Sequence, residues 1–123
     1  MIDHISLGTT DYAAAVSYYQ RVLEPLGISL LRDTGKEAAF GTSVQWAFFL
    51  YPVEGEKVTA PGMHIALAAP SRQAVAAVHA AALAAGASDI FTPRLRPDIS
   101  DTYFGAMVHD LDGHRFEVLT NAA

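Results

Sequence analysis

The chain has 123 residues, of which 51% are hydrophobic and 17% are charged, a balance that indicates one globular domain and argues against disorder. Its net charge of −5 and its lack of a Lys/Arg run argue against a nucleic-acid partner. Because it has no cysteine, no apolar stretch long enough to span a membrane and no signal peptide at its N-terminus, we expect a cytoplasmic protein without disulfides, thiolate ligands or a membrane partner.

The first half of the chain predicts a strand, a helix and then three strands, over about residues 2–8, 11–25, 28–32, 37–40 and 44–51. Thr9-Thr10-Asp11 offers an N-cap for the helix, and Pro25 and Gly27 end it. The last of these strands is rich in aromatic residues. Residues 52–61, with two prolines and one glycine, predict a loop or linker.

The second half predicts the same order of elements, over about residues 63–69, 71–85, 89–92, 103–109 and 115–120. Gly86 ends the second helix, and residues 93–101 are expected to form a flexible loop at the mouth of a site. Asp110-Leu111-Asp112-Gly113 predicts a tight turn between the last two strands.

The two halves also resemble each other in sequence. The segment His4-Ile5-Ser6-Leu7 parallels His64-Ile65-Ala66-Leu67, and the helices that follow end at Gly27 and Gly86. A repeat of about 60 residues predicts two copies of one βαβββ unit, with modules over about 1–52 and 62–121. We therefore expect a single domain of α+β class, whose strands form a cup-shaped mixed sheet with the helices outside.

Three polar side chains, His4, His64 and Glu117, interrupt short strands of alternating pattern. Because strand side chains alternate between faces, their apolar neighbours are expected in a core and these three on the opposite face. Two imidazoles and one carboxylate are the ligand set of a catalytic metal site with open positions. The pattern predicts one divalent ion per site, and Fe, Mn, Ni and Zn are all compatible with it.

These motifs resemble those of the vicinal oxygen chelate superfamily, which includes glyoxalases, bleomycin-resistance proteins, fosfomycin-resistance thiol transferases, methylmalonyl-CoA epimerase and extradiol dioxygenases. The resemblance spans the chain and is carried by residues 2–7, 63–66 and 110–117. The last segment is close to the family signature Asp-Pro-Asp-Gly-(Asn/His)-x-x-Glu, with Leu111 in place of proline. The resemblance implies that His4, His64 and Glu117 bind the metal and that a substrate chelates it through two adjacent oxygens.

Many relatives add a fourth ligand, often Glu or Gln, from the fourth strand. The corresponding strand here, residues 44–51, has no carboxylate; we align Phe48 near the ligand position, and Gln45 comes too early. This difference argues against a glyoxalase, whose proton transfer uses that carboxylate, and leaves the thiol transferases and one-domain dioxygenases.

Further residues are candidates for chemistry or for substrate contact. Tyr103 and His109, which share a strand face with Met107, are acid–base candidates beside Glu117 if that face is the inner one. The expected substrate contacts are Ser6, on the face of His4; Trp46, Phe48 or Phe49 and Tyr51, as an apolar wall; Met107; and Arg94 with Arg96, for an anionic group. By contrast, His79 and His114 are expected to be solvated.

Three classes of function follow from these observations. The first is a metal-dependent enzyme acting on a small substrate, as a lyase, isomerase, thiol transferase or one-domain dioxygenase, and the ligand triad favours it. The second is a metal-free binding protein for an aromatic or cationic drug, like the bleomycin-resistance relatives. The third is a domain with a relic site. The resemblance also implies a homodimer, with the site within one chain or shared between two.

Overall fold

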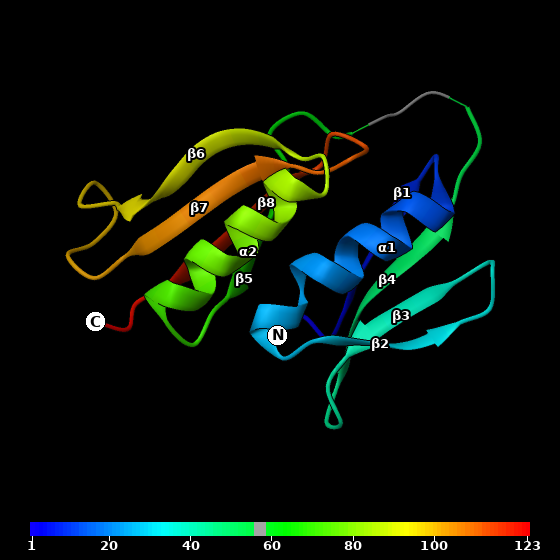
Figure 1. Cartoon of the computed structure of the whole chain (residues 1–123), viewed down its shortest axis with the longest axis horizontal. Helices are drawn as coiled ribbons and strands as arrows, with labels where there is room; N and C mark the ends of the chain where they lie inside the picture. Colours follow the sequence, from blue (N-terminus) through cyan, green and yellow to red (C-terminus); the bar gives the residue numbers. More distant parts are fainter. Residues whose placement is uncertain (56–58) are drawn as a thin grey trace. The chain divides into compact units, whose positions relative to one another are not determined.

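The computed structural model describes residues 1–55 and 59–123, and the chain divides into two compact units, Met1–Lys57 and Val58–Ala123 (Figure 1). Each unit contains one α-helix and a four-stranded mixed sheet in the order βαβββ. The predicted α+β class with two such modules is confirmed. The predicted loop over residues 52–61 includes residues 56–58, which lie outside the described residues. Neither α-helix of the described part is long and apolar enough to cross a membrane.

The first unit forms a sheet of strand order β1-β4-β3-β2, in which β1 and β4 are parallel and the other pairs antiparallel. The side chain of Asp11 caps the helix by accepting a hydrogen bond from the amide of Ala14, and Gly27 closes the following turn at φ 73°. The elements are β1 (Ile5–Thr9), α1 (Tyr12–Val22), a 3-10 turn (Glu24–Leu26), β2 (Ser29–Asp33), β3 (Ala38–Gly41) and β4 (Trp46–Pro52).

One face of this sheet carries the core of the unit. Tyr19 of α1 packs against Phe48 and Phe40, with ring centroids 4.7 and 6.4 Å apart, and all three are almost fully buried. Leu50 lies on the same face, because it alternates with Phe49 along β4. The opposite face, which we call the open face of the unit, is the one on which Phe49 lies.

The second unit repeats this plan with strand order β5-β8-β7-β6, and β5 and β8 are parallel. Strand β6 continues to Leu95, past the predicted end, although it contains Pro93. A proline is tolerated here because β6 is an edge strand and its register with β7 shifts around that residue. The elements are β5 (His64–Ala68), α2 (Arg72–Ala84), β6 (Ser88–Leu95), β7 (Phe104–His109) and β8 (Arg115–Thr120).

Ser71 caps helix α2 by accepting a hydrogen bond at its hydroxyl from the amide of Ala74, and the helix packs against the second sheet (Figure 1). His79 of α2 is 7% exposed, and its Nε2 lies 2.7 Å from Oδ1 of Asp89 in β6. The prediction that His79 is solvated was therefore wrong. The alanine-rich helix presents this imidazole to the sheet, where a carboxylate on the edge strand pairs with it.

Candidate functional site

Glu117 lies in β8 with only 4% of its surface exposed. It pairs in register with Ala66 of β5 and with Met107 of β7. Its chain neighbours Phe116 and Val118 are buried on the other face, toward α2. The carboxylate therefore stands on the face of the second sheet opposite the helix, which we call the open face of that unit.

Two polar groups contact the two oxygens of this carboxylate. The Tyr103 hydroxyl donates a 2.6 Å hydrogen bond to Glu117 Oε2, and His64 Nε2 lies 3.3 Å from Oε1. Burial, and then the hydrogen bond to Glu117, raise the pKa of Tyr103 to about 12. Tyr103 thus keeps its proton at neutral pH and serves as a donor to the carboxylate. The second unit alone brings together three of the residues predicted from the sequence.

The other site residues predicted in this unit lie at different distances from Glu117 along the sheet. Met107 is the cross-strand neighbour of Glu117 and is half-buried beside it. His109 pairs with Arg115, two residues after Met107 on β7 and two residues before Glu117 on β8, so it lies on the same face but not next to the carboxylate. Arg94 pairs with Gly105, the position on β7 two residues before Met107.

In the first unit, His4 immediately precedes β1 and is half-exposed. Its Nδ1 lies 2.7 Å from Oδ1 of Asp3, and its ring meets the ring of Phe49 edge-on, with centroids 5.1 Å apart. The amide of Gln45 donates a hydrogen bond to the carbonyl of Asp3, which ties the start of β1 to the loop before β4. Ser6 pairs with Phe49 and lies on the open face, as expected.

The aromatic residues of β4 divide between the two faces. Phe48 packs in the core and is 2% exposed, so the predicted contact of Phe48 with substrate is not supported by its position. Phe49, which alternates with Phe48 along β4, lies on the open face. Trp46 is 43% exposed, and the guanidinium of Arg32 lies 5.3 Å from the centre of its ring.

A polar cluster on the open face of the first unit was not anticipated from the sequence. Glu37, just before β3, accepts hydrogen bonds from Arg32 of β2 and from the hydroxyl of Tyr51 of β4. The hydrogen bond from Arg32, and then that from Tyr51, hold the pKa of Glu37 below its usual value. No local motif links these three strands, so only the strand register could have revealed the cluster.

Comparison with known proteins identifies the family. Residues 1–118 match the sequence profile of the Glyoxalase/Bleomycin resistance protein/Dioxygenase superfamily. The chain belongs to this superfamily. Among curated protein sequences, none matches the chain significantly.

Solved structures of the superfamily fold resemble this chain over almost its whole length. A glyoxalase/bleomycin resistance protein from Albidiferax ferrireducens superposes with a TM-score of 0.84 at 24% identity, covering 98% of each chain. A glyoxalase-related enzyme from Fulvimarina pelagi gives 0.76 at 17% identity, covering 98% of this chain and 87% of the other. A mutant of the fosfomycin resistance protein FosX from Listeria monocytogenes, complexed with Mn(II) and 1S,2S-dihydroxypropylphosphonic acid, gives 0.70 at 20% identity, covering 96% and 87%. At these identities the likeness concerns the fold.

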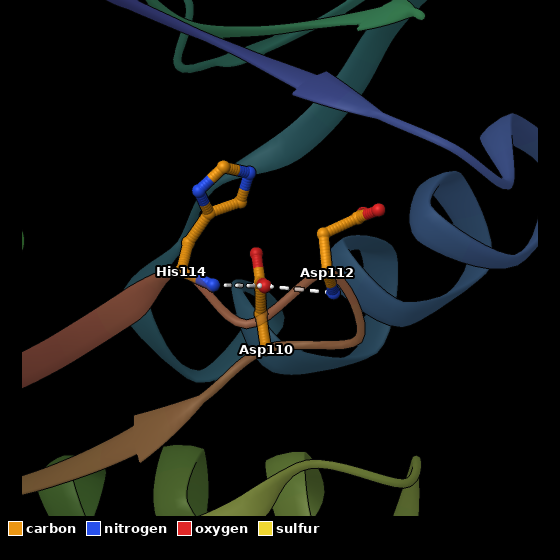
Figure 2. Close-up of side chains that lie close together, drawn as sticks. All are labelled: Asp110, Asp112 and His114. Carbon is orange, nitrogen blue, oxygen red and sulfur yellow. Dashed lines mark hydrogen bonds between the residues drawn. The ribbon is translucent and has the colours of Figure 1, made fainter. Parts of the chain in front are cut away.

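The chain itself also carries a cluster of two carboxylates and one imidazole in the turn between β7 and β8 (Figure 2). One ligand atom from each of Asp110, Asp112 and His114 lies within 4.8 Å of the others. Oδ1 of Asp110 already accepts hydrogen bonds from the amides of Asp112 (3.0 Å) and His114 (2.8 Å), and Gly113 adopts a φ of 90°. These bonds account for the cluster as part of a tight turn, so we assign no metal to it.

Proposed function

We propose that the protein is a metal-dependent enzyme whose divalent ion is bound by His64 and Glu117 of the second unit, with His4 of the first unit as third ligand. Its substrate is a small molecule that chelates the ion through two adjacent oxygens. The observation that carries this proposal is the contact between Nε2 of His64 and Oε1 of Glu117, 3.3 Å apart.

The spacing of these two atoms fits a shared ion. Two ligand atoms that each lie about 2.1 Å from one ion, at a tetrahedral or octahedral angle, are about 3.0–3.4 Å apart. The burial of Glu117 points the same way, because a carboxylate removed from water needs a cation or several donors. Tyr103 supplies one donor, on the oxygen that His64 does not contact.

In this proposal the ion, the residue that orients its ligand and the apolar residues each have a different role. When bound, the ion would polarise the oxygens of the substrate as a Lewis acid. Tyr103 fixes the orientation of the Glu117 carboxylate by donating its proton to Oε2, as an outer-shell hydrogen bond does for many metal ligands. Phe49 offers apolar surface to a substrate on the open face of the first unit, and so does Trp46, which a register shift between β3 and β4 places on that face near Arg32.

The reaction class within the superfamily remains lyase, isomerase, thiol transferase or one-domain dioxygenase. Phe49, and not a carboxylate, lies on the open face of β4. A proton transfer that depends on a fourth-strand Glu is therefore disfavoured, which argues against glyoxalase chemistry proper. The alternative function is metal-free binding of an aromatic or cationic ligand, and the exposed ring of Trp46 on β4 favours it.

His4 is proposed as the third ligand from its equivalence to His64 in the sequence repeat, and it would be supplied either by the same chain or by the partner of a homodimer. Mixing His4→Ala protein with Glu117→Ala protein distinguishes these arrangements. A site shared across a dimer recovers part of the metal binding after subunit exchange, whereas a site within one chain does not.

Metal content of the untagged protein, purified without chelator and supplied with Mn, Fe, Ni or Zn, tests the central proposal. We expect close to one ion per site in the wild type and none in Glu117→Gln or His64→Ala. Glu24→Gln, an exposed carboxylate in the first unit, is the control and should retain the ion. Unchanged metal content in Glu117→Gln contradicts the proposal, and a wild type that takes up no ion favours the ligand-binding alternative.

A further inference from the structure

An irregularity in β6 brings a cation to the open face of the second unit. Phe91 pairs with Met107 and Arg94 pairs with Gly105, so three steps along β6 match two steps along β7. In a regular strand, residues three apart point to opposite faces. The bulge between them instead places Arg94 on the face that carries Phe91 and Glu117, and bulges of this kind often redirect a side chain beside a functional site.

Two guanidinium groups stack on one aromatic ring at this place. The Cζ atoms of Arg94 and Arg96 lie 4.7 and 5.0 Å from the centre of the Phe91 ring. Although Phe91 belongs to an edge strand, it is only 8% exposed. Cation–π contact of this kind orients the guanidinium groups and reduces the freedom that they would lose on binding a ligand.

The two cations differ in how they interact with the nearby carboxylate of Asp98: Arg96 forms hydrogen bonds to it, whereas Arg94 acts on it only through the field of its charge. Arg96 donates two hydrogen bonds to Asp98, from Nε to Oδ1 at 2.9 Å and from Nη2 to Oδ2 at 2.7 Å. These bonds raise the pKa of Arg96 and lower the pKa of Asp98. Arg94 makes no hydrogen bond or ion pair with any residue in 1–55 or 59–123. The N–H donors of its guanidinium are therefore available to a ligand.

Two features of β7 and the chain before it relate the arginine pair to the proposed metal ligand. Gly105, opposite Arg94, has no side chain, and a Cβ there would lie 3.4 Å from Oε2 of Glu117. The amide of Arg96 donates to the carbonyl of Tyr103, whose hydroxyl donates to Glu117. The glycine thus keeps the surface between Arg94 and the carboxylate free of a side chain.

We propose that Arg94 binds a second anionic oxygen group of the substrate, a carboxylate or a phosphate, while the adjacent oxygens of that substrate face Glu117 and His64. This inference rests on the proposed function and narrows its substrate class to anions. A guanidinium matches the planar geometry of a carboxylate or two oxygens of a phosphate, and it keeps its charge at every relevant pH. In a chain of net charge −5, this free cation on the site face selects for an anionic substrate.

Two probes that differ only in the distal anion test the proposal. The first is 2-oxoglutarate, which has adjacent oxygens at one end and a carboxylate at the other, and the second is 2-oxopentanoate, which lacks the distal carboxylate. Titration calorimetry with the manganese-loaded protein gives their dissociation constants at fixed ionic strength. We expect the wild type to bind 2-oxoglutarate about tenfold more tightly than 2-oxopentanoate.

The variant Arg94→Gln should remove this preference, and Arg94→Lys should keep part of it because a point charge remains without the planar fork. Arg21→Gln, an exposed arginine on α1, is the matched control and should keep the full preference. A wild type without preference, or a preference that Arg94→Gln leaves unchanged, overturns the proposal.

Titration of Mn²⁺ alone, followed by the paramagnetic signal of the free ion, separates this proposal from that of the metal site. If no ion binds, the proposed function fails, and the anion site is tested in the metal-free protein with inorganic phosphate. The side-chain Nε–Hε resonance of Arg94, assigned by its loss in Arg94→Gln, should then shift saturably with phosphate. No shift overturns the anion site.

Discussion

Phe49 occupies, in the first unit, the register position that Glu117 occupies in the second. Phe49 pairs with Ser6 across parallel strands, and Glu117 pairs with Ala66 across the corresponding pair. Ser6 and Ala66 are themselves equivalent members of the sequence repeat. Strand register therefore makes Phe49, and not Phe48, the residue of β4 that is equivalent to Glu117 of β8.

The histidine contacts of the two units correspond in the same way. His4 meets the ring of Phe49, whereas His64 lies against the carboxylate of Glu117. If His4 is a metal ligand, Phe49→Glu adds a carboxylate beside it and should tighten metal binding by about tenfold or more, since even outer-shell changes alter affinity by 10–100-fold. Competition with a chromophoric chelator measures the affinity, with Phe49→Leu as the control. If both variants bind the metal with equal affinity, His4 is not a metal ligand.

The turn cluster and the proposed site make opposite predictions for metal content. Asp112→Asn removes one carboxylate from the group of Asp110, Asp112 and His114 with little change of shape. Because we attribute that group to the turn, metal content should stay at the wild-type level, whereas Glu117→Gln abolishes it. Mass spectrometry of both variants after identical purification decides the matter. Loss of the ion in Asp112→Asn would move the metal site to the turn.

The hydrogen bond from Tyr103 to Glu117 predicts a measurable stability change. Tyr103→Phe leaves the buried carboxylate with one donor fewer, so the free energy of unfolding should fall by about 1–2 kcal/mol at neutral pH. Urea unfolding measures this value. A variant as stable as the wild type would mean that the bond contributes nothing net.

The raised pKa of Tyr103 predicts part of the loss of folding stability at alkaline pH. The pKa of Tyr103 is raised to about 12 in the folded protein, against 10.0 for an unperturbed tyrosine. The folded state thus binds the proton of Tyr103 more tightly than the unfolded state. Its contribution to the free energy of unfolding is complete below about pH 10 and is lost as the pH rises toward 12. Tyr103→Phe should flatten the decline of stability between pH 10 and 12. Part of the decline should persist, because the pKa of Tyr12 is also raised to about 12.

Sequence patterns predicted the elements that depend on strong local signals. The alternating segments around His64 and Glu117 gave the correct faces, because each has buried apolar neighbours and only one register satisfies them. The start of the first helix followed from the N-cap that Thr9-Thr10-Asp11 offers, because a side-chain cap acts within three residues, and Asp11 is the residue that caps it. These signals are local, so one sequence is enough to detect them.

Other features depended on contacts that no local pattern records. Phe48 and Phe49 are equally apolar, so alternation alone cannot assign which one faces the helix; packing against Tyr19 decides it. Arg94 was assigned to a loop because proline usually ends a strand, whereas an edge strand with a bulge accommodates Pro93 and redirects the arginine. Both differences arise from strand pairing over long separations.

The buried pair between α2 and β6 gives the last prediction. Nε2 of His79 lies 2.7 Å from Oδ1 of Asp89, and the imidazole is 7% exposed while the carboxylate is partly solvated. Asp89→Ala leaves a buried imidazole nitrogen without its partner, so the free energy of unfolding should fall by about 1–3 kcal/mol. Asp101→Ala, an exposed carboxylate in the loop before β7, is the control and should change it by less than about 0.5 kcal/mol.

A double-mutant cycle separates the pair from the individual side chains. With His79→Gln as the second change, the interaction energy between positions 79 and 89 should be about 0.5–3 kcal/mol, because the two groups are in direct contact. Metal content should be unaffected in all three variants, since the pair lies between α2 and β6 and not on the face of Glu117. An interaction energy near zero would mean that the helix is held to the edge strand by apolar packing alone.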